Sequence, residues 1–243
     1  MTLPPFPPCV LCASENTALR GSYPHRGDQN DMVDLFYCLD CQSFASPRAN
    51  PLPGDAALGW HLSVEERNTG YGKALFKKIG TKKPKILDVG CGIGTLINVA
   101  KSLGGDGVGF DTDKSATDYG QTQGLDVRCE MWDLSTPVPA PNLITCIMVL
   151  EHIHWPRPLL SDLVQAAAKY DAKLFVSVPW FNSNWWHYLS EPLEPGKFHA
   201  LEAPRNHVTH MSHQGFERAI QSFGAKKFKR INSLGWEGYL ITS

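Results

Sequence analysis

The 243-residue sequence has little net charge, because 23 Lys and Arg balance 24 Asp and Glu to leave −1 at pH 7. Such a balance gives no general attraction to nucleic acid or to anionic membranes. No apolar run approaches the roughly 20 residues needed to span a bilayer. The first eight residues lack the basic start and apolar core of a signal peptide. We therefore expect a cytoplasmic protein with reduced thiols and no membrane partner.

The chain also lacks internal repeats and has no low-complexity segment beyond a proline-rich start. Its length suits one large domain, or one typical domain with a small attachment. Changes in composition predict an N-terminal module at 1–50, a linker and helix at 51–84, and a main domain at 85–243 with a lid insertion at 180–212. Residues 21–34 are polar and are expected to form a loop.

A glycine-rich turn lies between two predicted strands. The run Ile86–Val89 has the length and β-branched content of a buried strand, and Gly-Cys-Gly-Ile-Gly follows at 90–94. Glycine makes such a turn easily because the backbone must bend sharply. Apolar residues at helical spacing occupy 95–103, and a strand at 107–110 leads into Asp111. This order is the layout of a nucleotide-binding half-fold, whose acid accepts hydrogen bonds from ribose hydroxyls.

The glycine spacing and Asp88 distinguish two kinds of cofactor. A dinucleotide site has G-x-G-x-x-G, whereas this chain has G-x-G-x-G with Asp88 two residues before the first glycine. A carboxylate there repels a phosphate and suits a cofactor with an ammonium group. The motif resembles the first motif of the class I S-adenosylmethionine-dependent methyltransferases. The resemblance implies that Asp88 sits beside the amino-acid end of the cofactor, with the glycines against its carboxypropyl chain.

Apolar patterning from residue 85 onward predicts the rest of the fold. Strands alternate with helices as far as about residue 179, which indicates a parallel sheet with both faces covered. Further elements are expected as helices at 63–77, 158–169 and 213–223 and strands at 35–38, 126–129, 143–149, 173–178, 227–232 and 237–242. The resemblance implies that the last two strands form a closing hairpin. The predicted class is α/β, a Rossmann-like seven-stranded methyltransferase sheet with helices on both faces.

The end of the strand at 126–129 is expected to complete the cofactor site, because ligands of open α/β sheets bind outside the carboxyl ends of the strands. Glu130 is predicted to accept a hydrogen bond from the adenine amine, with Trp132 as a stacking face and Asp133 as the competing acid. The residues assigned to cofactor binding are Asp88, Gly90, Cys91, Gly92, Gly94, Asp111, Thr112, Glu130, Met131, Trp132 and Met148.

Glu151 and His152 follow the strand at 143–149 in a Val-Leu-Glu-His sequence. This sequence resembles a segment of a large group of class I methyltransferases, some of which hold a divalent metal with E-x-x-E-H. Here the first of those positions is Met148, which argues against metal-assisted catalysis. For Glu151 and His152, a structural pair that orders the turn and a catalytic pair are equal alternatives.

His207 lies in a histidine-rich stretch before the helix at 213–223, at the rim of the substrate pocket that the resemblance implies. Imidazole ordinarily titrates near neutral pH, so it can remove a proton from the methyl acceptor. His207, His152 and Glu151 are therefore the catalytic candidates. His207 is the preferred general base, and His210 is either a second candidate base or a capping and packing residue.

Four of the seven cysteines form two C-x2-C pairs, Cys9 with Cys12 and Cys38 with Cys41. Two such pairs present four thiolates to one cation, as in closed tetrahedral zinc sites. A reducing compartment argues against disulfides, and the repeated spacing argues against unpaired core cysteines. We predict one structural Zn2+ bound by Cys9, Cys12, Cys38 and Cys41 in a small, zinc ribbon-like module.

These features together predict an enzyme that transfers a methyl group from S-adenosylmethionine to a small-molecule acceptor, such as a sugar or a nucleotide-linked sugar. A zinc-containing ribosomal-RNA base methyltransferase is the alternative enzyme, but residues 1–50 contain only Arg20, Arg26 and Arg48 as cations. A non-catalytic cofactor-binding module is the third hypothesis, and the intact acids and glycines argue against it. The acceptor atom and the oligomeric state stay open.

Overall fold

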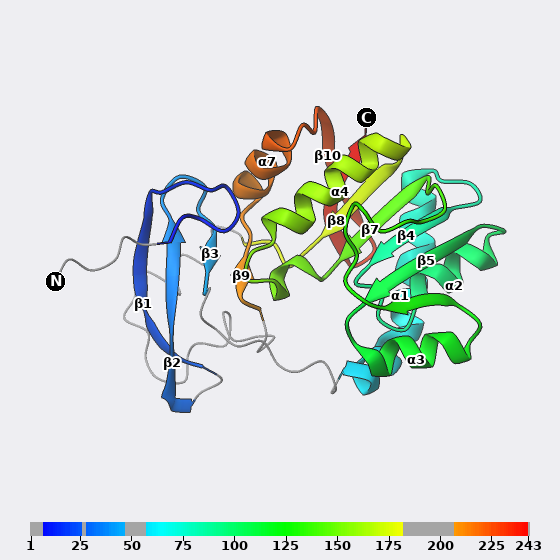
Figure 1. The fold of residues 1–243 in the computed structure, drawn as a ribbon, viewed down its shortest axis with the longest axis horizontal. Helices are drawn as coiled ribbons and strands as arrows, with labels where there is room; N and C mark the ends of the chain where they lie inside the picture. The colour runs from blue at the N-terminus through cyan, green and yellow to red at the C-terminus, as the bar shows by residue number, and fades with distance from the viewer. Residues whose placement is uncertain (1–6, 26–27, 47–56, 182–206, 243) are drawn as a thin grey trace. The chain divides into compact units, whose positions relative to one another are not determined.

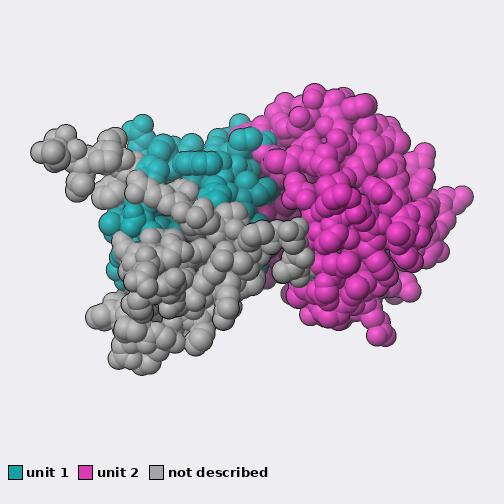
Figure 2. All heavy atoms as spheres, turned by 60° about the horizontal axis from the view of Figure 1, so that its bottom comes forward, with its two compact units in different colours: residues 1–52, 150–158, 179–222 teal, residues 53–149, 159–178, 223–243 magenta. Residues whose placement is uncertain are grey.

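A computed structural model describes residues 7–25, 28–46, 57–181 and 207–242 (Figure 1). The chain forms two compact units, which Figure 2 shows in different colours. Unit 1 contains residues 1–52, 150–158 and 179–222, and unit 2 contains residues 53–149, 159–178 and 223–243. Three stretches that are distant in the sequence thus build unit 1. The boundaries expected at 1–50, 51–84 and 85–243 stay predictions, and most of the expected lid at 180–212 falls outside the described residues.

Unit 2 is built on a seven-stranded sheet with the order β10-β11-β8-β7-β4-β5-β6. The strands are β4 Lys85–Val89, β5 Asp106–Asp111, β6 Asp126–Cys129, β7 Leu143–Ile147, β8 Lys173–Ser177, β10 Lys227–Ser233 and β11 Trp236–Thr242. From β8 to β6 the neighbouring strands are parallel, and the β10–β11 hairpin joins β8 in antiparallel pairing. The predicted Rossmann-like sheet with its closing hairpin is confirmed.

Helices cover both faces of this sheet, as can be followed in Figure 1. They are α1 Ala57–Ile79, α2 Thr95–Ser102, α3 Lys114–Thr122 and α4 Arg157–Tyr170. Because α1 contacts both α2 and α3, these three helices share one face. The chain steps from β4 to β5 and β6 in one direction but from β7 to β8 in the other, so right-handed crossovers place α4 on the opposite face. No helix among the described residues is long and apolar enough to cross a membrane.

The core of unit 2 explains why the parallel strands are continuous apolar runs in the amino-acid sequence. Leu87 of β4, Ile144 of β7 and Phe175 of β8 are all 0% exposed, since central strands are covered on both faces. Ile97 of α2 and Leu75 of α1 lie with Phe175 in one hydrophobic cluster. This packing holds the β4 and β5 ends rigidly at one edge of the sheet.

Unit 1 contains a four-stranded sheet in the order β1-β2-β3-β9, together with one 3-10 helix and the α-helix α7 among its described elements. The elements are β1 Thr17–His25, β2 Asp28–Cys38, β3 Phe44–Ala45, the 3-10 helix η2 Leu150–His152, β9 Thr209–His210 and α7 His213–Ser222. The loop expected at 21–34 is wrong, because β1 and β2 pair in antiparallel register from Thr17 opposite Cys38 outward. Inter-strand backbone hydrogen bonds stabilise this ribbon, and composition alone does not reveal them.

Two helices of unit 2 differ from expectation. Helix α1 runs over Ala57–Ile79 and begins six residues before the expected start at Ser63, so part of the predicted linker is helical. Helix α3 was not expected, because few of its residues are apolar. Asp113 caps it, since one carboxylate oxygen accepts from the N–H groups of Ser115 at 2.8 Å and Ala116 at 3.1 Å.

Candidate functional site

The loop between β4 and α2 is the tightest turn at the carboxyl edge of the unit 2 sheet. Gly90, Gly92 and Gly94 have φ of 79°, 52° and 82°, which side-chain-bearing residues rarely adopt. The N–H groups of Gly90 and Cys91 donate to the carbonyl of Phe110 on β5 at 2.7 and 3.1 Å. The N–H of Gly94 donates to the Cys91 carbonyl at 2.9 Å, so the loop curls directly into the start of α2, where a ligand carboxylate is favoured.

Asp111 ends β5 and faces the glycine loop. One carboxylate oxygen accepts from the N–H of Gly92 at 2.7 Å, and the other accepts from the N–H of Asp113 at 2.9 Å. Each oxygen has a second lone pair, so Asp111 can still accept from a ribose hydroxyl. The structure therefore brings the predicted ribose acceptor and the glycine turn together.

Asp88 lies within β4 and is 4% exposed. Its carboxylate accepts a hydrogen bond from the Thr145 hydroxyl at 2.6 Å. Burial raises the pKa of Asp88 to about 7; the Thr145 hydrogen bond opposes this shift and the charge of Asp111 adds to it. A buried carboxylate in this state gains most from a cationic neighbour. The ammonium group of S-adenosylmethionine fits that requirement.

His61 on α1 is a site residue that sequence patterns did not reveal. Its imidazole packs so closely on Gly92 that a Cβ at that glycine would overlap it. Burial lowers the pKa of His61, while the charges of Asp111 and Asp113 act in the opposite direction. The helix expected from the sequence begins at Ser63, so His61 falls in the predicted linker before it. Its position makes it a border of the glycine loop.

Of the four residues expected to form the cofactor site after β6, only some are open to a ligand. Glu130 is exposed and Met131 is 73% exposed, so both are open to a ligand. Trp132 is 4% exposed, and its ring packs within the protein. The carboxylate of Asp133 accepts from the Ser135 N–H at 2.8 Å and also from Thr136, so it serves a local turn. Of the two competing acids, Glu130 is the one without a local role.

Three further residues assigned to the cofactor lie on strand ends of unit 2. Cys91 is 8% exposed within the glycine loop. The Thr112 carbonyl accepts a weak hydrogen bond from the Cys129 thiol at 3.9 Å. Met148, directly after β7, has φ of 56°, and its N–H donates to the Ser177 carbonyl at 2.8 Å. The left-handed backbone conformation of Met148 is strained for a residue with a side chain, and such strain concentrates at binding sites.

The four paired cysteines form a compact cluster in unit 1. The Sγ atoms of Cys9 and Cys41 are 3.6 Å apart, those of Cys12 and Cys38 are 3.6 Å apart, and all four lie within 4.8 Å of one another. A tetrahedral zinc ion with thiolate ligands needs sulfurs about 3.8 Å apart. The cluster therefore fits one ion. The contact between the Cys9 and Cys41 thiols lowers the pKa of Cys9 and raises the pKa of Cys41.

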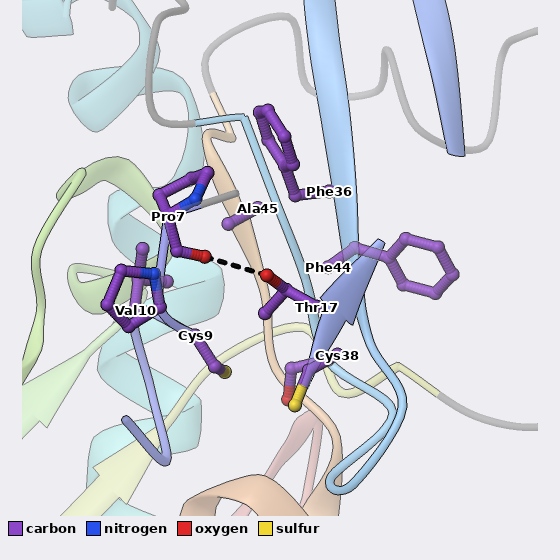
Figure 3. Close-up of a pocket in the computed structure, with 10 residues that line it drawn as sticks. Pro7, Cys9, Val10, Thr17, Phe36, Cys38, Phe44 and Ala45 are labelled. Carbon is purple, nitrogen blue, oxygen red and sulfur yellow. Dashed lines mark hydrogen bonds between the residues drawn. The ribbon is translucent and has the colours of Figure 1, made fainter. Parts of the chain in front are cut away.

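The cysteine cluster is surrounded by ordered structure of unit 1. Figure 3 shows Cys9 and Cys38 lining a pocket beside Thr17, whose hydroxyl donates to the Pro7 carbonyl at 2.8 Å. The Arg157 guanidinium donates to the Leu11 carbonyl at 2.6 Å between the first two cysteines.

Helix α7 also packs against the cluster. A Cβ at Gly215 would lie 3.0 Å from the Cys41 sulfur. The Ser212 hydroxyl accepts from the N–H of Gly215 at 2.9 Å and donates to the Cys41 carbonyl. Loss of the cluster would thus disturb unit 1 beyond the two C-x2-C turns.

Glu151, His152 and His207 form a second cluster in unit 1, with one ligand-type atom of each within 4.8 Å of the others. Glu151 Oε1 lies 3.8 Å from His152 Nε2 and 3.7 Å from His207 Nε2. Burial raises the pKa of Glu151 to about 8. Burial, assisted by the nearby His152 and His210, lowers the pKa of His207 to about 3. All three predicted catalytic residues therefore share one location.

Comparison with known proteins agrees with this fold. The family described as a methyltransferase domain matches residues 63–229. The chain therefore belongs to this methyltransferase domain family. No curated protein sequence matches the chain.

Solved structures resemble the chain in fold. The human N-acetylserotonin methyltransferase in complex with SAM superposes with a TM-score of 0.54 at 15% identity, over 78% of this chain and 56% of the human chain. The plantazolicin methyltransferase in complex with SAH gives 0.54 at 14% identity, over 78% and 88% of the two chains. PigF with SAH gives 0.56 at 16% identity, over 77% and 58%. This chain spans just over half the length of the human enzyme.

Proposed function

We propose that this methyltransferase transfers the methyl group of S-adenosylmethionine to a small-molecule acceptor, a sugar or a nucleotide-linked sugar. The observation that carries cofactor binding is the Asp111 carboxylate hydrogen-bonded to Gly92, with buried Asp88 on the neighbouring strand. Two similar solved structures are methyltransferases named for their acceptors, N-acetylserotonin and plantazolicin, which supports an acceptor other than RNA.

For the cofactor, we propose contacts from the eleven residues predicted above, from Asp88 to Met148. His61 is added to them because its imidazole borders the glycine loop at Gly92. The acids would receive the ammonium group and the ribose hydroxyls, and the exposed Glu130 would receive the adenine amine. Bound cofactor supplies a methyl group already activated by the positive sulfur.

For the reaction, we propose in-line displacement with removal of the acceptor proton by His207, or by His152 with Glu151 beside it. The residues at 151 and 152 follow β7 within a few positions, and ligands of such sheets bind at the carboxyl ends of strands. Positioning of the acceptor would supply much of the rate, with the base adding a factor of about 10² to 10⁴.

We further propose one structural zinc ion at Cys9, Cys12, Cys38 and Cys41. Their sulfur spacing supports it, and the reducing, cytoplasmic location expected from the sequence would keep the thiols free to bind the ion. A small-molecule acceptor rather than RNA remains the proposed partner.

The acceptor class is tested by incubating the protein with S-adenosylmethionine labelled at the methyl group. One panel of acceptors holds sugars and nucleotide-linked sugars, and the other holds ribosomal-RNA fragments. Transfer to a member of the first panel is the expected result. Transfer to RNA alone would replace the proposal with the RNA alternative. Failure of S-adenosylhomocysteine to bind by calorimetry would remove the cofactor assignment itself.

A further inference from the structure

We propose that Glu151, His152 and His207 hold a divalent first-row transition metal ion, at a site separate from the four cysteines of unit 1. The three side chains place a carboxylate oxygen and two imidazole nitrogens within 4.8 Å of one another. The proposal concerns metal binding by the folded chain and does not depend on methyl transfer. The role of His207 or His152 as a base belongs to the metal-free protein, since an ion on the Nε2 atom occupies the lone pair that would take the proton.

The state of the Glu151 carboxylate is the first observation. Glu151 is 1% exposed, and neither carboxylate oxygen has a hydrogen-bond partner. A buried carboxylate without a hydrogen bond or counter-charge is strongly unfavourable, and native proteins satisfy such groups with a donor or a cation. The Nε2 atoms of His152 and His207 lie 3.8 and 3.7 Å from Glu151 Oε1, beyond hydrogen-bonding distance, and a cation bound among the three groups would satisfy the carboxylate.

The separations between ligand atoms are the second observation. Glu151 Oε1 lies 3.8 Å from His152 Nε2 and 3.7 Å from His207 Nε2. Two ligands bound at ordinary zinc–nitrogen and zinc–oxygen lengths to one ion lie about 3.0 to 3.5 Å apart. The observed distances are too long for hydrogen bonds and only a few tenths of an ångström too long for ligation. A small inward movement of the side chains completes the site.

The backbone fixes these ligands although they are distant in the sequence. The N–H of Val208, next to His207, donates to the Glu151 carbonyl at 2.8 Å. The Thr209 hydroxyl donates to the Ile153 carbonyl at 3.0 Å, so both sides of the turn at η2 are fastened. Pairing of β9 with β3 holds the same segment from its other side. A site whose ligands stand on hydrogen-bonded backbone is organised before an ion binds.

The donor set identifies the class of ion. Two imidazoles and one carboxylate suit zinc, iron(II), cobalt(II) or manganese(II), whereas magnesium and calcium prefer oxygen ligands alone. Three protein ligands leave at least one coordination position open, unlike the closed four-thiolate cluster. The ion bound here can therefore also accept an oxygen atom of a small molecule.

Cobalt(II) is the probe that separates the two sites. Full-length protein is first loaded with one equivalent of zinc, which the closed four-thiolate site takes up, and cobalt is then titrated in the absence of cofactor, acceptor and further zinc. We expect about one cobalt per chain with weak ligand-field absorption and no thiolate charge-transfer band. Glu151→Gln and His207→Ala should each weaken this binding by at least about 100-fold, since removal of even outer-shell groups costs 10- to 100-fold.

Glu15→Gln is the matched control, because Glu15 is an exposed carboxylate of the same unit and its replacement should leave cobalt binding unchanged. Glu151→Gln replaces a buried carboxylate with a neutral isostere, so circular dichroism should show a folded variant. Absence of cobalt binding to zinc-loaded wild type would overturn the proposal. Equal binding by wild type and both folded variants, or a thiolate band alone, would overturn it as well. Neither result would bear on S-adenosylhomocysteine binding, which is measured separately without cobalt.

Discussion

The Asp111 carboxylate accepts a hydrogen bond of 2.7 Å from the backbone N–H of Gly92, so the end of β5 holds the loop that follows β4. Two strands that are neighbours in the sheet thus fix each other's ligand-binding ends. This contact organises the loop before the cofactor arrives, which lowers the entropy lost on binding.

Asp111→Ala should weaken S-adenosylhomocysteine binding by about 10- to 100-fold, because a charge-assisted acceptor for the ribose and the support of Gly92 are both lost. Isothermal calorimetry of wild type and variant measures this. Asp106→Ala, at the exposed start of the same strand, is the control and should bind normally. Binding of NAD instead of S-adenosylhomocysteine by the wild type would contradict the assignment.

Asp88 should make both folding and cofactor binding depend on pH. Its pKa is raised to about 7 in the folded protein, above the model-peptide value near 3.9. The folded chain therefore binds the extra proton, and this residue's contribution to stability falls as pH rises from about 4 to about 7. Thermal unfolding of Asp88→Asn should lack that component, and the Thr145 hydrogen bond can persist. Parallel pH profiles for wild type and Asp88→Asn would contradict the shift.

For cofactor binding the pH dependence from Asp88 should run the other way. The ammonium group attracts the ionised carboxylate, so S-adenosylhomocysteine affinity should rise through about pH 7 and the rise should vanish in Asp88→Asn. Calorimetry on either side of that pH measures the difference.

Gly94 should tolerate a methyl group less well than Gly104. Both have positive φ, 82° and 73°, so alanine at either position carries a similar backbone penalty of about 1 kcal/mol. Only at Gly94 would the new Cβ meet a neighbour, Leu125 Cδ1 at 2.8 Å, while nothing lies within 4 Å at Gly104. Urea unfolding should therefore rank Gly94→Ala as the less stable variant, and equal losses would show that the loop relaxes freely.

One zinc ion per chain should be found in protein prepared without chelator. Removing it, or replacing Cys38 with serine, should unfold unit 1 before unit 2, because metal binding contributes folding free energy directly. Elemental analysis gives the zinc content, and limited proteolysis follows the order of unfolding. Cys129→Ser, at an exposed thiol outside the cluster, should keep the metal. Far less than one zinc per chain would contradict the site.

His207→Ala should lower turnover by about 10² to 10⁴-fold, with His152→Ala as the alternative, while cofactor affinity stays nearly unchanged. Single-turnover rates on an identified acceptor, with calorimetry beside them, measure both quantities. His154→Ala, in the same turn but outside the cluster, is the control. Near-normal turnover in both cluster variants would show that positioning alone carries the reaction.

Features encoded within short stretches were predictable. The β4–glycine–α2–β5 order follows from an apolar strand, three glycines and one acid, because strand periodicity and tight turns depend on neighbouring residues. The closing hairpin, which the family resemblance implies, is observed as well. Helix α3 was missed because an Asp113 cap and tertiary packing form it rather than an apolar stripe.

By itself, the sequence determined the methyltransferase sheet, its glycine loop with Asp88 and Asp111, and the paired cysteines. Only the tertiary structure decided that residues 21–25 and 28–34 pair as strands, that His61 packs on Gly92, and that His207 joins Glu151 and His152. The physical reason is the range of the interactions. Turns and strand periodicity depend on neighbouring residues, whereas cross-strand hydrogen bonds and converging side chains depend on segments brought together by the folded backbone.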